Sequence, residues 1–205
     1  MDLESVSARL GASLAGPTLR RKGKAGILLE HVLGASAGNA AIPDFPELGV
    51  ELKTVPMDPA GKPRESTFVG TIDLTNADRD EWETSRTRAK LARVLFVPII
   101  SPDRGSPPSV CVVGRAVLFS PTPEQDAVLR DDFESAMGLI AIGKVELVRA
   151  NLGRWMQVRP KAADSHVRTR AISDDEGWMT TNPRGFYLRA RFVEAILRDP
   201  NAVPP

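Results

Sequence analysis

The feature that most constrains the fold is a change of hydrophobic period along the 205-residue chain. Apolar residues recur at helical spacing over 3–15 and 26–33, whereas residues 48–55 alternate between apolar and polar, which is typical of a strand. Two helices followed by strands favour a mixed sheet flanked by helices, an α/β fold. Runs rich in β-branched and aromatic residues predict the further strands, at 67–74, 93–100 and 112–119.

The C-terminal half continues this mixture of helices and strands. Thr122, Pro123 and Gln125 have the pattern of a helix start, with a capping threonine, proline in the first position and glutamine in the third. We expect this helix to end near Gly138 and a second helix to cover 139–150. The remaining pattern predicts a strand at 154–159, a loop-rich stretch at 162–183 and a last helix at 185–198.

Composition excludes several classes of protein. Cys111 is the only cysteine, which rules out an intrachain disulfide and a thiolate zinc cage and favours a reducing, cytoplasmic setting. The longest apolar run, residues 94–100, is too short to cross a bilayer, so we expect no membrane partner. We expect one domain over residues 1–205 with two sub-lobes and a disordered or Pro-rich tail at about 199–205.

The segment DFPELGVELKTVP carries the most informative chemistry. Glu51 and Lys53 lie two residues apart on a predicted strand, so both side chains point to the same face, and Asp44 precedes the turn before it. Two carboxylates can hold Mg²⁺, which prefers oxygen ligands, and a neighbouring lysine can orient the attacking water during phosphodiester hydrolysis. Glu30, on the preceding helix, could add a carboxylate.

The same spacing also fits a plainer interpretation. A surface strand whose glutamate and lysine face water would show an identical pattern, and Glu30 could simply mark the polar edge of its helix. Spacing alone does not separate the two.

Seven blocks of sequence resemble the MutH family of DNA mismatch-repair endonucleases, in the same order and across nearly the whole chain. This resemblance implies a restriction-endonuclease-like fold: a mixed sheet flanked by helices, with two arms around a DNA-binding cleft. It also implies a Mg²⁺-dependent enzyme that nicks the unmethylated strand at hemimethylated GATC sites, activated by MutL after MutS finds a mismatch. The blocks are KGKAGILLEHVLGASAG, DFPELGVELKTVP, STFVG, WETSRTRAKLARVLFVP, LRDDFESAMGLI, QVRPKAA and PRGFYL.

The resemblance also assigns roles to single residues. Asp44, Glu51 and Lys53 match the family's catalytic residues, Glu30 its additional acidic residue and Lys90 a second lysine associated with catalysis. Four further residues match DNA contacts: a basic residue near the DNA and three side chains that read the site in the major groove. These are Lys22 and then Arg159, Lys161 and Tyr187.

The charge balance does not oppose a DNA partner. The chain has 27 basic and 26 acidic side chains, a net charge of +1, but the basic residues gather in clusters while five acids lie between Glu124 and Glu134. Phosphates respond to local charge density rather than to the total. The basic clusters lie at residues 20–24, 86–93, 149–170 and 184–191.

Two other functions share most of these features. A restriction endonuclease would cut both strands of unmethylated GATC, and a DNA-binding module would bind without cleaving. One copy of the catalytic set in one domain favours a monomer that nicks a single strand.

Overall fold

The principal sheet forms around a parallel pair of strands, β1 (Glu51–Met57) and β3 (Val94–Ile100), whose register runs from Glu51 opposite Val94 to Met57 opposite Ile100. The computed structural model describes residues 2–9, 24–35, 42–161, 166–175 and 177–204. β3 also pairs antiparallel with β4 (Val112–Val113) and β5 (Val117–Phe119), so the sheet is mixed, as expected.

The strand predicted over 112–119 is divided into β4 and β5. Pro98 of β3 lies between the residues that pair with β5 and those that pair with β4. It has no N–H to donate, so the hydrogen-bond ladder along β3 is interrupted at that point. The N–H of Gly114 instead donates to the Pro98 carbonyl at 2.8 Å. A Cβ at residue 114 would lie 3.0 Å from the Pro98 ring, so the crossing point needs glycine.

A second, antiparallel sheet has β9 (Arg184–Leu188) between β2 (Thr67–Thr71) and β6 (Met156–Pro160). The helix predicted over 185–198 is therefore wrong in its first part: only α5 (Ala190–Arg198) is helical. Phe186 and Leu188 are buried and alternate with Tyr187, which is strand periodicity, and β9 has strand partners on both sides. Apolar residues on either side of Arg189 also fit a helical spacing, so the sequence pattern does not show the boundary between β9 and α5.

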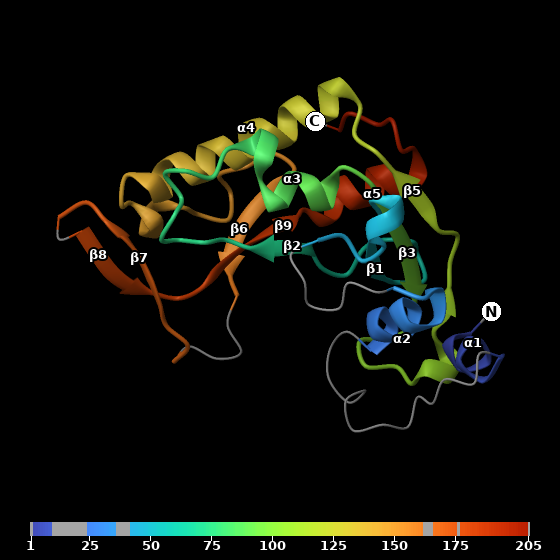
Figure 1. Ribbon diagram of the computed structural model, residues 1–205. Helices are drawn as coiled ribbons and strands as arrows, with labels where there is room; N and C mark the ends of the chain where they lie inside the picture. Colours follow the sequence, from blue (N-terminus) through green and yellow to red (C-terminus); the bar gives the residue numbers. More distant parts are fainter. Residues whose placement is uncertain (1, 10–23, 36–41, 162–165, 176, 205) are drawn as a thin grey trace.

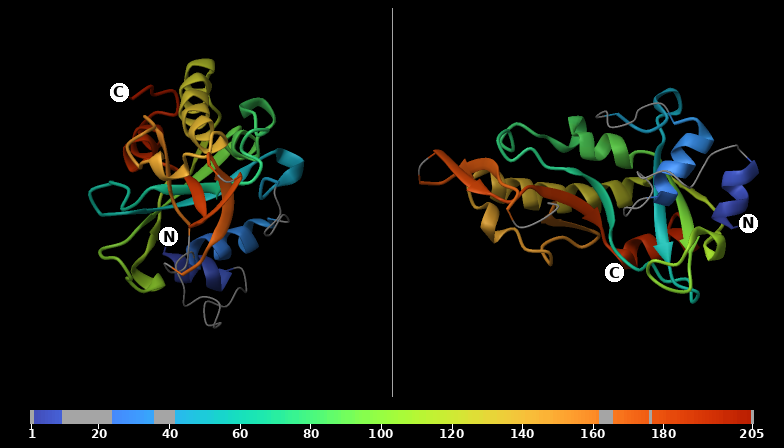
Figure 2. Two further views of the ribbon diagram at one scale, coloured as in Figure 1. Left: turned by 90° about the vertical axis from the view of Figure 1, so that its left-hand side faces the viewer. Right: turned by 90° about the horizontal axis from the view of Figure 1, so that it is seen from below.

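The prediction of a loop-rich stretch at 162–183 is also wrong in part. Two strands, β7 (Thr169–Ser173) and β8 (Gly177–Thr181), form a hairpin at one end of an elongated molecule, away from the N-terminal helices (Figures 1 and 2). Ala171 is its fully buried side chain, while Trp178 is exposed and lies against Arg170. Apolar side chains lie on both faces of the hairpin, Ala171 and Met179 on one and Ile172 and Trp178 on the other, so the sequence does not show a clear alternation.

The helices cover the sheets on different sides. α1 (Leu3–Arg9) and α2 (Lys24–Leu33) share a hydrophobic cluster with Leu52 of β1, whereas the long helix α4 (Pro123–Ala141) packs on the second sheet, where Phe133 meets Phe186. No described helix is long and apolar enough to span a membrane. The other helical segments among the described residues are α3 (Arg86–Leu91) and four 3₁₀ turns, Pro46–Leu48, Trp82–Thr84, Pro108–Val110 and Val145–Leu147.

The start of α4 matches the prediction and its end does not. Thr122 and Gln125 form the full reciprocal capping box. The helix continues past Gly138 to Ala141, and the second helix expected over 139–150 is reduced to the 3₁₀ turn at Val145–Leu147. Gly143, at φ +79°, turns the backbone at that point.

The Pro-rich end of the chain is held against the core. Gln125 donates to the carbonyls of Pro200 and Ala202 at 2.9 and 2.8 Å, and the Trp155 indole donates to the Pro204 carbonyl at 2.9 Å. The described part of the tail therefore has fixed hydrogen-bond partners.

Asp132 of α4 fixes the start of β6. Its carboxylate accepts the backbone N–H groups of Arg154, Trp155 and Met156 at 2.6, 2.7 and 2.7 Å, and the side chain is buried. Such charge-assisted bonds stabilise the junction between the helix and the strand, because one buried carboxylate satisfies three backbone donors.

We expect Asp132→Ala to lower the free energy of unfolding by about 3 kcal/mol or more, because three backbone donors lose their acceptor. Urea denaturation measures the change. Asp131→Ala, at the exposed neighbour on the same helix, is the matched control and should change stability by less than about 0.5 kcal/mol. Equal effects of the two substitutions would contradict this role of Asp132.

Candidate functional site

The candidate site is centred on a buried glutamate with two lysines on one of its oxygens. Glu51 is 1% exposed, and its Oε1 accepts from Lys53 Nζ at 2.7 Å and from Lys90 Nζ at 2.9 Å. Lys53 lies on the same strand, whereas Lys90 comes from α3, so the packing of α3 completes the cluster. The other oxygen, Oε2, is buried and has no hydrogen-bond partner in the described part of the chain.

Asp44 is held beside Glu51 by the backbone of the strand. Its Oδ2 accepts the N–H of Leu52 at 2.8 Å, and a bridge between Phe45 and Val50 closes the intervening loop, with Gly49 at φ +62° in the turn. Burial raises the pKa of Asp44, the Leu52 N–H opposes this shift and the Glu51 charge adds to it. The two carboxylates are thus close enough to repel each other.

Glu30 of α2 belongs to the same electrostatic cluster. Burial raises its pKa, the negative charges of Asp44 and Glu51 raise it further, and Lys53 and Lys90 lower it. Gly26, one turn earlier, lies at the contact between α2 and β1: a Cβ there would lie 3.4 Å from Thr54 Oγ1, an ordinary van der Waals distance. Five residues chosen from the sequence therefore converge, although the catalytic roles given to them stay predictions.

The alternative of a solvated surface strand is wrong for Glu51, because its side chain is buried and accepts hydrogen bonds from Lys53 and Lys90. The arrangement fits a divalent cation bound by oxygen ligands. Among the described residues, no group of three or more His, Cys, Asp and Glu side chains is placed to enclose a metal. Asp44 and Glu51 form a carboxylate pair, and the unpaired Oε2 is a free acceptor, so the donor set fits Mg²⁺, which keeps several water ligands.

A second group of predicted residues lies on the solvent-facing side of the second sheet. Lys161 Nζ lies 4.1 Å from the ring centroid of Phe68, and the Arg159 guanidinium lies 5.8 Å from that of Tyr187. The rings of Phe68 and Tyr187 are themselves 5.2 Å apart. Gly185 permits this packing, since a Cβ there would come within 2.9 Å of the Phe68 ring.

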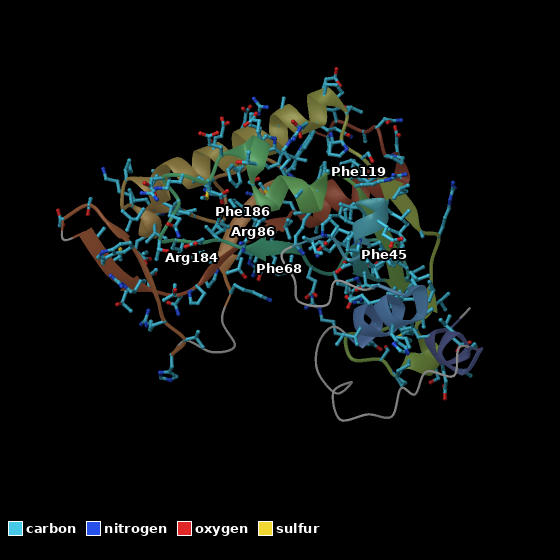
Figure 3. All side chains as sticks on the ribbon, in the orientation of Figure 1. Phe45, Phe68, Arg86, Phe119, Arg184 and Phe186 are labelled. Atoms are coloured by element: carbon cyan, nitrogen blue, oxygen red, sulfur yellow. The ribbon has the colours of Figure 1, made fainter. Side chains whose placement is uncertain are left out.

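Phe68 is the member of this group that sequence reasoning missed. In the alternating strand TFVGT it falls on the face opposite Thr67 and Val69, so an aromatic residue at a solvent-facing position was the available signal. Figure 3 places Phe68 and Phe186 on opposite sides of the sheet, with Phe186 toward α4. Tyr187 lies on β9, so the helix predicted over 185–198 is wrong at this position. Lys22 lies outside the described residues.

Comparisons with known proteins identify a family and relatives that this chain resembles. Residues 33–132 match the family described as DNA mismatch repair enzyme MutH. The chain is 44% identical over 198 residues to the DNA mismatch repair protein MutH of Shewanella amazonensis, covering 97% of this chain and 88% of that protein. The MutH proteins of Serratia proteamaculans and Escherichia coli K12 are 47% and 44% identical, over 91% and 95% of this chain and 82% and 85% of their own lengths.

The raised pKa of Asp44 gives a stability prediction with a defined sign. A carboxyl whose pKa is higher in the folded state stabilises the fold below its unfolded pKa of about 4, and this contribution is lost as pH rises through the folded value. Asp44→Asn removes the charge and keeps an oxygen for the Leu52 N–H. We expect its melting temperature in metal-free buffer at pH 7 to exceed that of the wild type by a few degrees, and the difference to disappear below about pH 4.

Asp131→Asn, at an exposed carboxyl of α4, is the control and should leave the melting temperature unchanged at both pH values. A lower melting temperature for Asp44→Asn at pH 7 would show that the folded protein favours this charge and would refute the argument.

Proposed function

The chain belongs to the MutH family of DNA mismatch repair enzymes, a family of DNA endonucleases, and from that premise we propose that it nicks the unmethylated strand at hemimethylated GATC sites. The reaction is a Mg²⁺-dependent hydrolysis of one phosphodiester, activated by MutL after MutS has found a mismatch. The observation that carries the proposal is the buried Glu51, with two ammonium groups on one oxygen and the other oxygen free.

Asp44 and Glu51 would hold the Mg²⁺ ion, which when bound polarises a phosphoryl oxygen and lowers the pKa of a water ligand. Lys53 and Lys90 each donate one of three N–H bonds to Glu51, which leaves donors for the attacking water and for charge that develops on the phosphate. Glu30 adds negative charge beside the pair and could order a further water.

The side chains on the solvent-facing side of the second sheet support the proposed recognition of the GATC sequence. Arg159 and Lys161 can donate to N7 and O6 of guanine, and each is held over an aromatic ring, which restricts the long side chain before DNA arrives. Tyr187 would sense by steric fit whether adenine N6 carries a methyl group.

The described residues contain one such carboxylate–lysine cluster, which supports cleavage of one strand by a monomer. A restriction endonuclease that cuts both strands of unmethylated GATC is the second candidate, because it would use the same chemistry. We also propose that the protein works in the cytoplasm, where its lone cysteine, buried at position 111, stays reduced.

The decisive experiment follows each strand of hemimethylated, unmethylated and fully methylated GATC duplexes with Mg²⁺, with and without MutL. We expect a nick in the unmethylated strand. Lys53→Ala and Glu51→Ala should each slow this cleavage by about 100-fold or more while the duplex is still bound. Lys62→Ala, at an exposed lysine beyond β1, is the matched control and should cleave normally.

The other outcomes are equally informative. A double-strand break in unmethylated DNA identifies a restriction enzyme, and specific binding without cleavage at any Mg²⁺ concentration identifies a binding module. Normal nicking by Lys53→Ala would remove the assignment of the active site.

Tyr187 gives a separate prediction about methylation. Tyr187→Ser removes the ring, so the ratio of cleavage rates for unmethylated and methylated adenine should fall by more than the rate on unmethylated DNA. Tyr187→Phe keeps the ring and should preserve the ratio. If Tyr187→Ser lowers both rates equally, the tyrosine contributes to structure and not to methyl recognition.

A further inference from the structure

A hollow of about 500 Å³ lies beside the face that carries Tyr187, at the point where β9 passes into α5. Three of the eight residues that line it are arginines. None of the residues that line it is acidic, and its polar lining comes from three arginines and three uncharged side chains, Arg159, Arg189, Arg191, Ser66, Asn151 and Gln157.

The positive charge of this hollow is not neutralised. Among the described residues, none of the three arginines forms an ion pair; their hydrogen bonds go to uncharged oxygens. Arg189 donates to the carbonyls of Ala150 and Gly153, both at 2.6 Å. Arg191 donates to the Arg154 carbonyl at 3.0 Å.

Arg159 completes the set, with a 3.1 Å bond to Ser66 Oγ. Burial lowers the pKa of Arg189, and the positive charge of Arg191 lowers it further. The two guanidinium groups are therefore close enough to repel each other. The acid whose field opposes this, Asp132, already accepts three backbone N–H groups. The protein thus holds two like charges together without a counterion from its own described residues.

The backbone adds to the attraction for an anion. α5 begins at Ala190, which lines the hollow, and its N-cap residue Arg189 makes no side-chain capping bond. The first N–H groups of a helix have no intrahelical acceptor and carry partial positive charge. The hollow therefore combines three guanidinium groups with a nine-residue helix whose N-terminus is open.

The position of the hollow indicates which anion it takes. Gln157 pairs with Tyr187 across the sheet, and Arg159 follows two residues later on the same face, so these side chains lead from the base-reading residues into the hollow. A duplex read by Arg159 brings its sugar–phosphate backbone to this place. We propose that the hollow binds a backbone phosphate of duplex DNA next to the recognised bases, with the exposed Arg191 as a donor to it; this rests on the proposed function.

Arg191→Gln tests the proposal because Arg191 is exposed and lies outside the catalytic cluster. If it neutralises one phosphate, the slope of log binding constant against log salt should be smaller by about 0.9 for Arg191→Gln than for the wild type. Arg198→Gln is the matched control: this arginine lies on the same helix, is 71% exposed and pairs with Glu194. Its slope should equal that of the wild type.

A scan with single methylphosphonate linkages then locates the phosphate. The wild type and Arg198→Gln should lose affinity at one linkage beside GATC to which Arg191→Gln is insensitive. Inorganic phosphate at millimolar concentration should not compete with the duplex, whereas strong competition would indicate a site for free phosphate and overturn the proposal. Identical slopes and identical scans for wild type and Arg191→Gln would overturn it too.

The same samples separate this inference from the proposed function. A wild type that nicks hemimethylated GATC while Arg191→Gln keeps the full salt slope refutes only the phosphate site. A wild type that neither nicks nor prefers GATC refutes the proposed function, whatever the arginine does.

Discussion

The shared hydrogen bonds of Glu51 determine how the rest of the structure must be arranged. A buried carboxylate is costly unless cations and donors compensate for its lost hydration. Here Lys53 and Lys90 approach one oxygen, so β1 must enter the sheet at Glu51, and α3 must pack where Lys90 can reach it. Oε2 has no such partner among the described residues, and removal of either lysine would leave the charge still less compensated. The site therefore has a free carboxylate oxygen that can bind a cation, and the parallel pair of strands holds this oxygen in place.

The sequence predicted the local part of this site well and the distant part only by resemblance. Glu51 and Lys53 follow from period-2 spacing in a single strand. Lys90 lies 39 positions from Glu51, and no spacing rule connects the two. Nor could a pattern show that both faces of β1 are buried: Leu52 packs with α2, while Val55 and Met57 enter the main core.

The errors in the sequence predictions arise where tertiary contacts, which a sequence pattern does not show, determine the structure. Residues 185–198 contain apolar side chains that satisfy a helical spacing, but hydrogen bonds from β2 and β6 make the first part a central strand. Tertiary pairing overrides local preference in such segments. The β7–β8 hairpin was missed because its buried positions are an alanine and a threonine, Ala171 and Thr181. Phe68 was missed because a half-buried aromatic ring on a strand shows its role only beside Tyr187.

The net charge of +1 conceals a separation of charge across the second sheet. α4, which carries the five acids between Glu124 and Glu134, packs on the face that holds Phe186, along one long side of the molecule in Figure 1. Arg159 and Lys161 lie with Phe68 and Tyr187 on the opposite face. The sheet and its apolar core lie between α4 and these two basic side chains, and within the described residues neither Arg159 nor Lys161 pairs with an acid of α4. A polyanion near this molecule would therefore be attracted by the face that carries Arg159 and Lys161 and repelled by the face that α4 covers.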